Sequence, residues 1–177
     1  MPHGVVAIDN FEQFHSTSSQ PMTQRQHGKN KFGNYYQYYF LSHCHTDHYK
    51  GLHDAFFQNA AVSNQTCIIC HPITKTLLLS QFPKLDTERI LTIDLHQPTL
   101  LTYKHNESSR SFTVTLLSSN HCPGSVMFLF DIPMKDQSHE IERILYTGDF
   151  RDPTIETIQF LKEVKLTKIY LDVSSRC

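Results

Sequence analysis

The sequence contains no tryptophan, only 6 glycines among its 177 residues and no long uninterrupted apolar segment. A membrane-spanning helix requires roughly 18 or more consecutive apolar residues, so no such helix is predicted. The first residues also lack the basic segment and the apolar core that make up a signal peptide. We therefore expect no secretion signal and no membrane partner.

An excess of charge of one sign is also missing, because 16 Lys and Arg are balanced by 17 Asp and Glu. The formal net charge of −1 gives no general support for binding to a nucleic acid, so any such function must depend on a local site. The 5 cysteines are odd in number and scattered, which favours reduced thiols over a disulfide framework. The run Cys67-Ile68-Ile69-Cys70 predicts two core cysteines on a buried strand.

A packed core is nevertheless well supplied, since 39% of the residues are hydrophobic and 12 are Phe. The length predicts one domain over residues 1–177, with a polar surface loop or insertion at about residues 15–34. Apolar and aromatic runs predict strands at residues 5–8, 35–41, 67–70, 90–95, 112–117, 126–130, 144–146 and 169–171. Helices are predicted from Pro72 to Leu79 and over residues 154–164. Many strands and few helices predict an α/β sandwich.

The 12 histidines are the unusual feature of the composition, and several of them follow predicted strands. His43, His45, Asp47 and His48 lie within one short segment directly after an aromatic strand. Imidazole nitrogens are typical ligands of zinc, and the added carboxylate suits a second, more oxygen-rich metal position. A solvated, histidine-rich loop is the alternative interpretation. A closed zinc finger is disfavoured, because the cysteines are not paired with histidines at finger spacing.

One such segment cannot supply all the ligands of a two-metal site, so further ligands must come from distant parts of the chain. His121 follows the strand predicted at residues 112–117. Asp149 follows the strand predicted at residues 144–146 and a glycine that permits a sharp turn. Because a sheet fixes where its loops begin, functional side chains often gather at strand ends. The three segments therefore predict a common metal site.

Residues 40–52 (FLSHCHTDHYKGL) resemble the HxHxDH signature of metallo-β-lactamase-fold hydrolases. Residues 120–130 (NHCPGSVMFLF) and 145–151 (LYTGDFR) resemble, more specifically, the β-CASP DNA nucleases of the Artemis and Apollo type. Residues 169–172 are similar to the strand that carries the first β-CASP motif of that family. The first of these segments is most similar to the Artemis branch. The resemblance implies a metallo-β-lactamase-like αββα sandwich.

The resemblance also implies roles for the candidate metal ligands. His43, His45 and His121 would hold one zinc ion. Asp47 and His48 would face a second metal position. The carboxylate that would bridge the two positions is that of Asp149.

The same resemblance implies two supporting residues and one proton acceptor. Asp9 would support the metal site without being a ligand, and Asp172 would lie near the second metal position. Asp47 is also placed to orient the attacking water or to accept its proton. The residues expected to take part in catalysis are Asp47, His121 and Asp149.

The reaction implied by the resemblance is hydrolysis of DNA phosphodiester bonds by metal-activated water. The implied setting is DNA repair in the nucleus, in the processing of double-strand breaks or interstrand cross-links. The implied substrates are single-stranded, overhanging or damaged DNA ends. DNA-repair proteins are further candidate partners.

The chain also departs from the pattern of this family. His71 stands where the family usually has serine, and the distal metal-binding histidine and the β-CASP domain have no counterpart in the sequence. We therefore expect the N-terminal part of an incomplete metallo-β-lactamase-like domain, with a weakened second metal position and impaired activity. Two alternatives stay open. One is a non-catalytic fragment that binds a metal or a partner, and the other is an RNA-processing enzyme or ester hydrolase on the same fold.

Overall fold

The computed structural model describes residues 5–12, 36–59, 62, 64–105, 108–134 and 140–172. The polar loop predicted at residues 15–34 lies outside the described residues. Within the described part of the chain, no helix is both long and apolar enough to span a membrane. The extent of the domain stays a prediction.

The smaller of two β-sheets is entirely parallel, with its strands in the order β1-β2-β3-β4. These strands are β1 (Val6–Ile8), β2 (Tyr38–Phe40), β3 (Cys67–Cys70) and β4 (Ile90–Thr92). Parallel neighbours need a crossover connection, which helix α1 (Pro72–Gln81) provides between β3 and β4. Short 3-10 helices lie at Phe56–Gln58 and Thr87–Arg89.

The larger sheet has the strand order β5-β6-β7-β8-β9. These strands are β5 (Thr99–His105), β6 (Ser108–Ser118), β7 (Val126–Pro133), β8 (Ile141–Tyr146) and β9 (Lys168–Tyr170). Pairing is antiparallel from β5 to β8, whereas β9 runs parallel to β8. Helix α2 (Ile155–Lys162) forms the crossover between β8 and β9.

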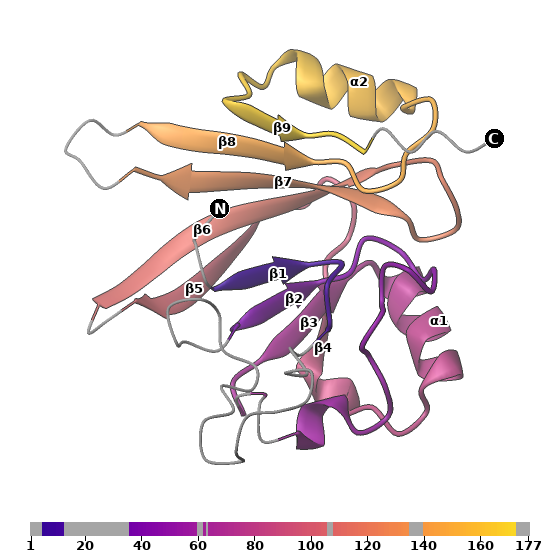
Figure 1. Cartoon of the computed structure of the whole chain (residues 1–177). Helices are drawn as coiled ribbons and strands as arrows, with labels where there is room; N and C mark the ends of the chain where they lie inside the picture. Colours follow the sequence, from indigo (N-terminus) through magenta and orange to yellow (C-terminus); the bar gives the residue numbers. More distant parts are fainter. Residues whose placement is uncertain are drawn as a thin grey trace, which may run out of the picture.

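The two sheets pack face to face, and one helix lies on the outer side of each sheet (Figure 1). The core between the sheets is aromatic, since the ring of Phe40 in β2 lies 5.2 Å from those of Phe128 and Phe130 in β7. Leu78 of α1 packs on the other face of the smaller sheet. Phe160 of α2 packs on the outer face of the larger sheet. The layers are therefore α-β-β-α, and the predicted α/β sandwich is confirmed.

Both helices begin with a capped N-terminus. His71 precedes α1, and its Nδ1 accepts a hydrogen bond from the backbone N–H of Ile73 at 3.3 Å. Pro72 occupies the first helical position, where no backbone donor is needed. Oγ1 of Thr154 accepts the backbone N–H of Thr157 at 3.2 Å. The predicted start of α1 is confirmed, and α2 begins one residue later than predicted because Thr154 is its cap.

Most of the predicted strands are present, and β6 and β7 are longer than their apolar runs. The sequence analysis missed β5, in which the buried Leu101 and Tyr103 alternate with exposed neighbours and form no continuous apolar run. The strand predicted at residues 90–95 is shorter in the structure. Its Leu95 forms an isolated bridge to Leu116 instead.

Strand direction brings the predicted site segments to one edge of the sandwich. β6 and β8 run the same way, because each pairs antiparallel with β7. The carboxyl ends of β6 and β8 shortly precede His121 and Asp149, and that of β2 shortly precedes His43. The backbone N–H of Val126 donates to the carbonyl of Ser42 at 3.0 Å and so joins β7 to the segment after β2. Segments from both sheets therefore meet at this edge.

The aromatic core predicts a large loss of stability in Phe40→Ala. Phe40 is fully buried, so removal of its ring leaves a cavity between the sheets. The free energy of unfolding should fall by about 3–5 kcal/mol. The control is Leu100→Ala in β5, where the side chain is 65% exposed and the change should stay below about 0.5 kcal/mol. Urea unfolding measures both variants, and equal effects would contradict this packing.

Candidate metal centre

Three imidazoles and one carboxylate converge at this edge. The ligand atoms of His43, His45, His121 and Asp149 all lie within 4.8 Å of one another. Nε2 of His43 lies 3.0 Å from Nδ1 of His45, which lies 3.3 Å from Nε2 of His121. Oδ2 of Asp149 lies 3.8 Å from Nε2 of His43 and 3.4 Å from Nε2 of His121. Three distant segments of the chain thus direct ligand atoms at one place.

The spacing of these atoms fits a tetrahedral metal ion. A Zn–N distance of roughly 2.0–2.1 Å puts neighbouring ligands of a tetrahedron about 3.3–3.4 Å apart. The four separations given above range from 3.0 to 3.8 Å. Imidazole nitrogens with one carboxylate are also donors that zinc and neighbouring transition metals prefer. Both the donor types and their spacing therefore fit a bound transition metal.

The environment of His43 keeps its imidazole neutral. Burial, followed by the nearby imidazoles of His48, His45 and His121, lowers the pKa of His43 from 6.5 to about 3. Burial also lowers the pKa of His121. A neutral imidazole offers a nitrogen lone pair, whereas a protonated one does not. Both side chains are therefore ready to bind a metal ion near neutral pH.

His48 and Asp47 lie on the other side of the Asp149 carboxylate. Nε2 of His48 is 3.2 Å from Oδ1 of Asp149 and 3.8 Å from Oδ2 of Asp47. Oδ2 of Asp149 therefore faces the three-histidine cluster, while Oδ1 faces His48. A cavity of about 300 Å³ is lined here by Asp47, His48, Asp149 and Asp172, among others. This arrangement suits a carboxylate shared between two metal positions.

The acidic groups around this cavity are crowded. Burial, and next a hydrogen bond with Asp172, raises the pKa of Asp149. Two carboxyl groups in contact resist ionisation together, because their negative charges repel each other. The side chain of Asp47 is by contrast 81% exposed. A cation in the cavity would balance the charge of the Asp149 and Asp172 pair.

Asp9 holds the surrounding side chains in place. Its Oδ1 accepts the backbone N–H of Ser42 at 2.8 Å, and its Oδ2 accepts the hydroxyl of Ser42 at 2.7 Å. Oδ2 also lies 2.9 Å from Nδ1 of His48 and accepts the Tyr146 hydroxyl at 3.2 Å. Burial alone would lower the pKa of His48, but Asp9 and then Asp149 raise it. Asp9 thereby orients the His48 ring so that Nε2 faces Asp149.

The turn that places Asp149 requires a glycine. Gly148 has a φ of 51°, in the left-handed region that side chains disfavour. A Cβ at this position would lie 3.1 Å from Oγ and 3.2 Å from Cβ of Ser42. Since Asp9 holds Ser42 through two hydrogen bonds, a larger residue at position 148 would displace the turn and the carboxylate that follows it.

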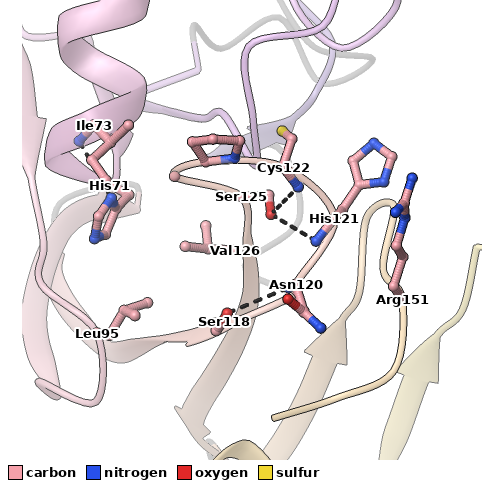
Figure 2. A pocket seen from close by; sticks show the side chains of 12 residues that line it. His71, Ile73, Leu95, Ser118, Asn120, His121, Cys122, Ser125, Val126 and Arg151 are labelled. Carbon is pink, nitrogen blue, oxygen red and sulfur yellow. Dashed lines mark hydrogen bonds between the residues drawn. The ribbon is translucent and has the colours of Figure 1, made fainter.

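His121 is placed by a tight loop after β6. Oγ of Ser125 accepts the backbone N–H groups of His121 at 3.1 Å and of Cys122 at 3.0 Å (Figure 2). The hydroxyl of Thr74 in α1 donates to the carbonyl of Gly124 at 2.8 Å. Gly124 itself has a φ of 79°. The loop that carries His121 is therefore closed by Ser125 and tied to α1.

Every site residue predicted from the sequence lies at this edge, while their roles as ligands or catalytic groups stay predictions. These residues are Asp9, His43, His45, Asp47, His48, His121, Asp149 and Asp172. The sequence analysis missed the supporting residues Ser42, Tyr146, Ser125 and Thr74. Ser42, Tyr146 and Ser125 lie within a few residues of the proposed ligands, so their hydroxyl groups could have been noted from the sequence. The sequence gives no such signal for Thr74, because it lies on a helix far from His121 in the sequence.

No protein-family model matches the chain. Artemis from Homo sapiens is 42% identical over 118 residues, which are 64% of this chain and 16% of that protein. The DNA cross-link repair protein Pso2/Snm1 from Schizosaccharomyces pombe is 34% identical over 137 residues, covering 77% of this chain and 21% of that protein. The 5′ exonuclease Apollo from Gallus gallus is 35% identical over 135 residues, which are 76% of this chain and 24% of that protein. The chain is homologous to these three proteins.

The homologues confirm the resemblance inferred from the motifs and fit the N-terminal portion of a β-CASP nuclease. The chain spans between 16% and 24% of the length of these relatives. Among solved structures, the metallo-β-lactamase MIM-1 from Novosphingobium pentaromativorans aligns with a TM-score of 0.45 and 16% identity. That alignment covers 75% of this chain and 49% of the other.

The convergence of ligand atoms predicts that His121→Ala reduces metal binding. Loss of one of three imidazoles should lower the affinity for zinc at least about tenfold, and His43→Ala should do the same. His53→Ala is the control, because His53 is exposed and outside the cluster. Metal content after loading and dialysis measures all three variants. Equal content in the three would contradict the assignment.

The lowered pKa of His43 predicts acid-sensitive stability in the metal-free protein. The unfolded chain takes up a proton at His43 as the pH falls below about 6.5, whereas the folded protein does so only near pH 3. The contribution of the neutral side chain is therefore present above pH 6.5 and is lost as the pH falls toward 3. His43→Gln removes this difference, so its urea midpoint should fall less between pH 7.5 and 5. An equal fall in both proteins would contradict the proposed cause.

Proposed function

We propose that this chain binds zinc at the three-histidine cluster and takes part in the hydrolysis of DNA phosphodiester bonds in DNA repair. The observation that carries the proposal is the convergence of three imidazole nitrogens on one carboxylate, whose second oxygen faces His48. Relatives named for DNA cross-link repair and for 5′ exonuclease activity support DNA as the substrate class.

Bound zinc would activate water for attack and stabilise the negative charge on the phosphodiester oxygens. The chain supplies the positioning for this chemistry. Asp149 would offer one oxygen to each metal position, and Asp9 fixes His48 beside it. Asp47 is exposed at the cavity and can orient the attacking water or accept its proton.

We propose that the second metal position binds its ion more weakly than the first. Among the described residues that line its cavity, His48 is the one imidazole. The other side chains there that suit a metal ion are the carboxylates of Asp47, Asp149 and Asp172. Carboxylate-rich sites hold transition metals less tightly than sites with several imidazoles. Weak binding there would lower the nuclease activity of the chain. Zinc titration followed by calorimetry tests this point, and two equally tight sites would contradict it.

A second candidate function is that of a metal-binding chain that docks on a partner and turns over little substrate. Exposed apolar side chains after the last metal motif favour it, since Ile155, Ile169 and Leu171 are 70%, 53% and 56% exposed. DNA-repair proteins are the partners proposed for this surface. Bound zinc without cleavage of DNA or RNA would support this candidate over the first.

We also propose a nuclear location, because the proposed substrate is found there. This proposal is supported by the DNA-repair names of the relatives alone. Imaging of the fluorescently tagged chain tests it, and exclusion from the nucleus would contradict it.

The exposed carboxylate of Asp47 predicts that Asp47→Ala lowers metal-dependent cleavage of single-stranded DNA by at least about 100-fold. Zinc content of the three-histidine cluster should stay unchanged, because Asp47 is not part of it. Asp152→Ala is the matched control, an exposed carboxylate on the segment after Asp149.

The assay compares DNA and RNA of equal sequence, with and without a chelator. Retained cleavage by Asp47→Ala would assign the activity to another site. Preference for RNA would support an RNA-processing enzyme on the same fold.

A further inference from the structure

A second cavity, of about 510 Å³, adjoins the candidate metal centre. His121 lines this cavity, and its Nε2 also belongs to the metal cluster. His71 lines it from the start of α1 and Arg151 from the turn after Asp149, on opposite sides of the view in Figure 2. A ligand in this cavity would therefore lie beside His121, one of the candidate metal ligands.

Arg151 presents a positive charge at this cavity. Its backbone N–H donates to the carbonyl of Ser119 at 3.0 Å, which fixes where the side chain begins. Among the described residues, the guanidinium has no ion pair and no hydrogen bond. Arg143, by contrast, has its Nε 3.2 Å from Oδ1 of Asp131. Within the described part of the chain, Arg151 is therefore free to bind an anion.

His71 presents a hydrogen-bond donor from the other side. Its Nδ1 accepts the backbone N–H of Ile73, so the proton of the neutral ring must lie on Nε2. Burial lowers the pKa of His71, and the ring is therefore neutral near pH 7. The cavity is also lined by the apolar side chains of Leu95 and Ile73, and Ile73 is 45% exposed.

We propose that this cavity binds the nucleotide next to the cleaved phosphodiester, with Arg151 binding its phosphate and His71 donating to its sugar or base. The inference deepens the proposed function and rests on it for the identity of the substrate. A guanidinium binds phosphate oxygens through two parallel hydrogen bonds. Apolar side chains such as Leu95 and Ile73 suit contact with a sugar or a base. The cavity has the volume of a small-ligand site.

The experiment measures binding of a 5′-phosphorylated, fluorescein-labelled single-stranded DNA 12-mer by anisotropy, with EDTA and with zinc. Arg151→Ala should weaken binding about tenfold and reduce the slope of log affinity against log salt by about 0.7, the value for one phosphate contact. Arg151→Lys keeps the charge and should restore part of the DNA affinity and part of the salt slope. The matched control is Arg110→Ala, at the opposite end of β6 from His121, where affinity should stay within about twofold.

His71→Asn tests the other side of the cavity. Asparagine can still cap α1, so the melting temperature should stay unchanged while DNA affinity falls about threefold. The salt slope should not change, because a neutral donor is lost and no charge.

Unchanged affinity and salt slope in Arg151→Ala would overturn the inference, as would absence of DNA binding by the unaltered chain. An affinity loss that comes with a lower melting temperature and no rescue by lysine would assign Arg151 a structural role and also overturn it. The EDTA arm separates this inference from the proposed function. If Arg151→Ala weakens DNA binding but the protein binds no zinc, the DNA contact is supported and the zinc site is contradicted. If the protein binds zinc but Arg151→Ala leaves DNA binding unchanged, the zinc site is supported and the DNA contact is contradicted.

Discussion

The candidate site depends on one buried carboxylate, that of Asp9 at the end of β1. Its two oxygens accept hydrogen bonds from Ser42 and Tyr146, and one of them also lies beside His48. Ser42 and His48 lie after β2 of the smaller sheet, and Tyr146 ends β8 of the larger sheet. A buried carboxylate is costly unless it is hydrogen-bonded, so these contacts are needed for the fold as well as for the site. They also fix Ser42, the residue directly before the segment that carries His43 and His48. Stability and metal geometry are therefore coupled through the same side chain.

Much of this arrangement could be predicted from the sequence, because each metal motif follows a predicted strand. The HxHxDH segment, His121 and Asp149 were recognised as strand-end residues, and the structure brings them to one edge. Buried strands with continuous apolar runs, such as β3 and β7, were also predicted. In each case a local pattern and the later packing point to the same conformation.

The features that the sequence could not reveal depend on contacts between distant segments. β5 was missed because only its inward side chains, Leu101 and Tyr103, are buried, and its neighbours are polar or exposed. The hydrogen bond from Thr74 to Gly124 joins residues 50 positions apart and has no local pattern. The cavity between His71 and Arg151 likewise forms only when α1 and the turn after Asp149 meet the loop of His121.

X-ray absorption at the zinc edge tests the central claim most directly, because it reports the atoms bound to the metal. The account predicts three imidazole nitrogens and one oxygen at roughly 2.0–2.1 Å, with no sulfur. Cys44 and Cys122 directly adjoin three of the proposed histidine ligands, so the protein carries nearby thiols that could compete. A sulfur ligand at about 2.3 Å, or zinc bound through fewer than three imidazoles, would contradict the account.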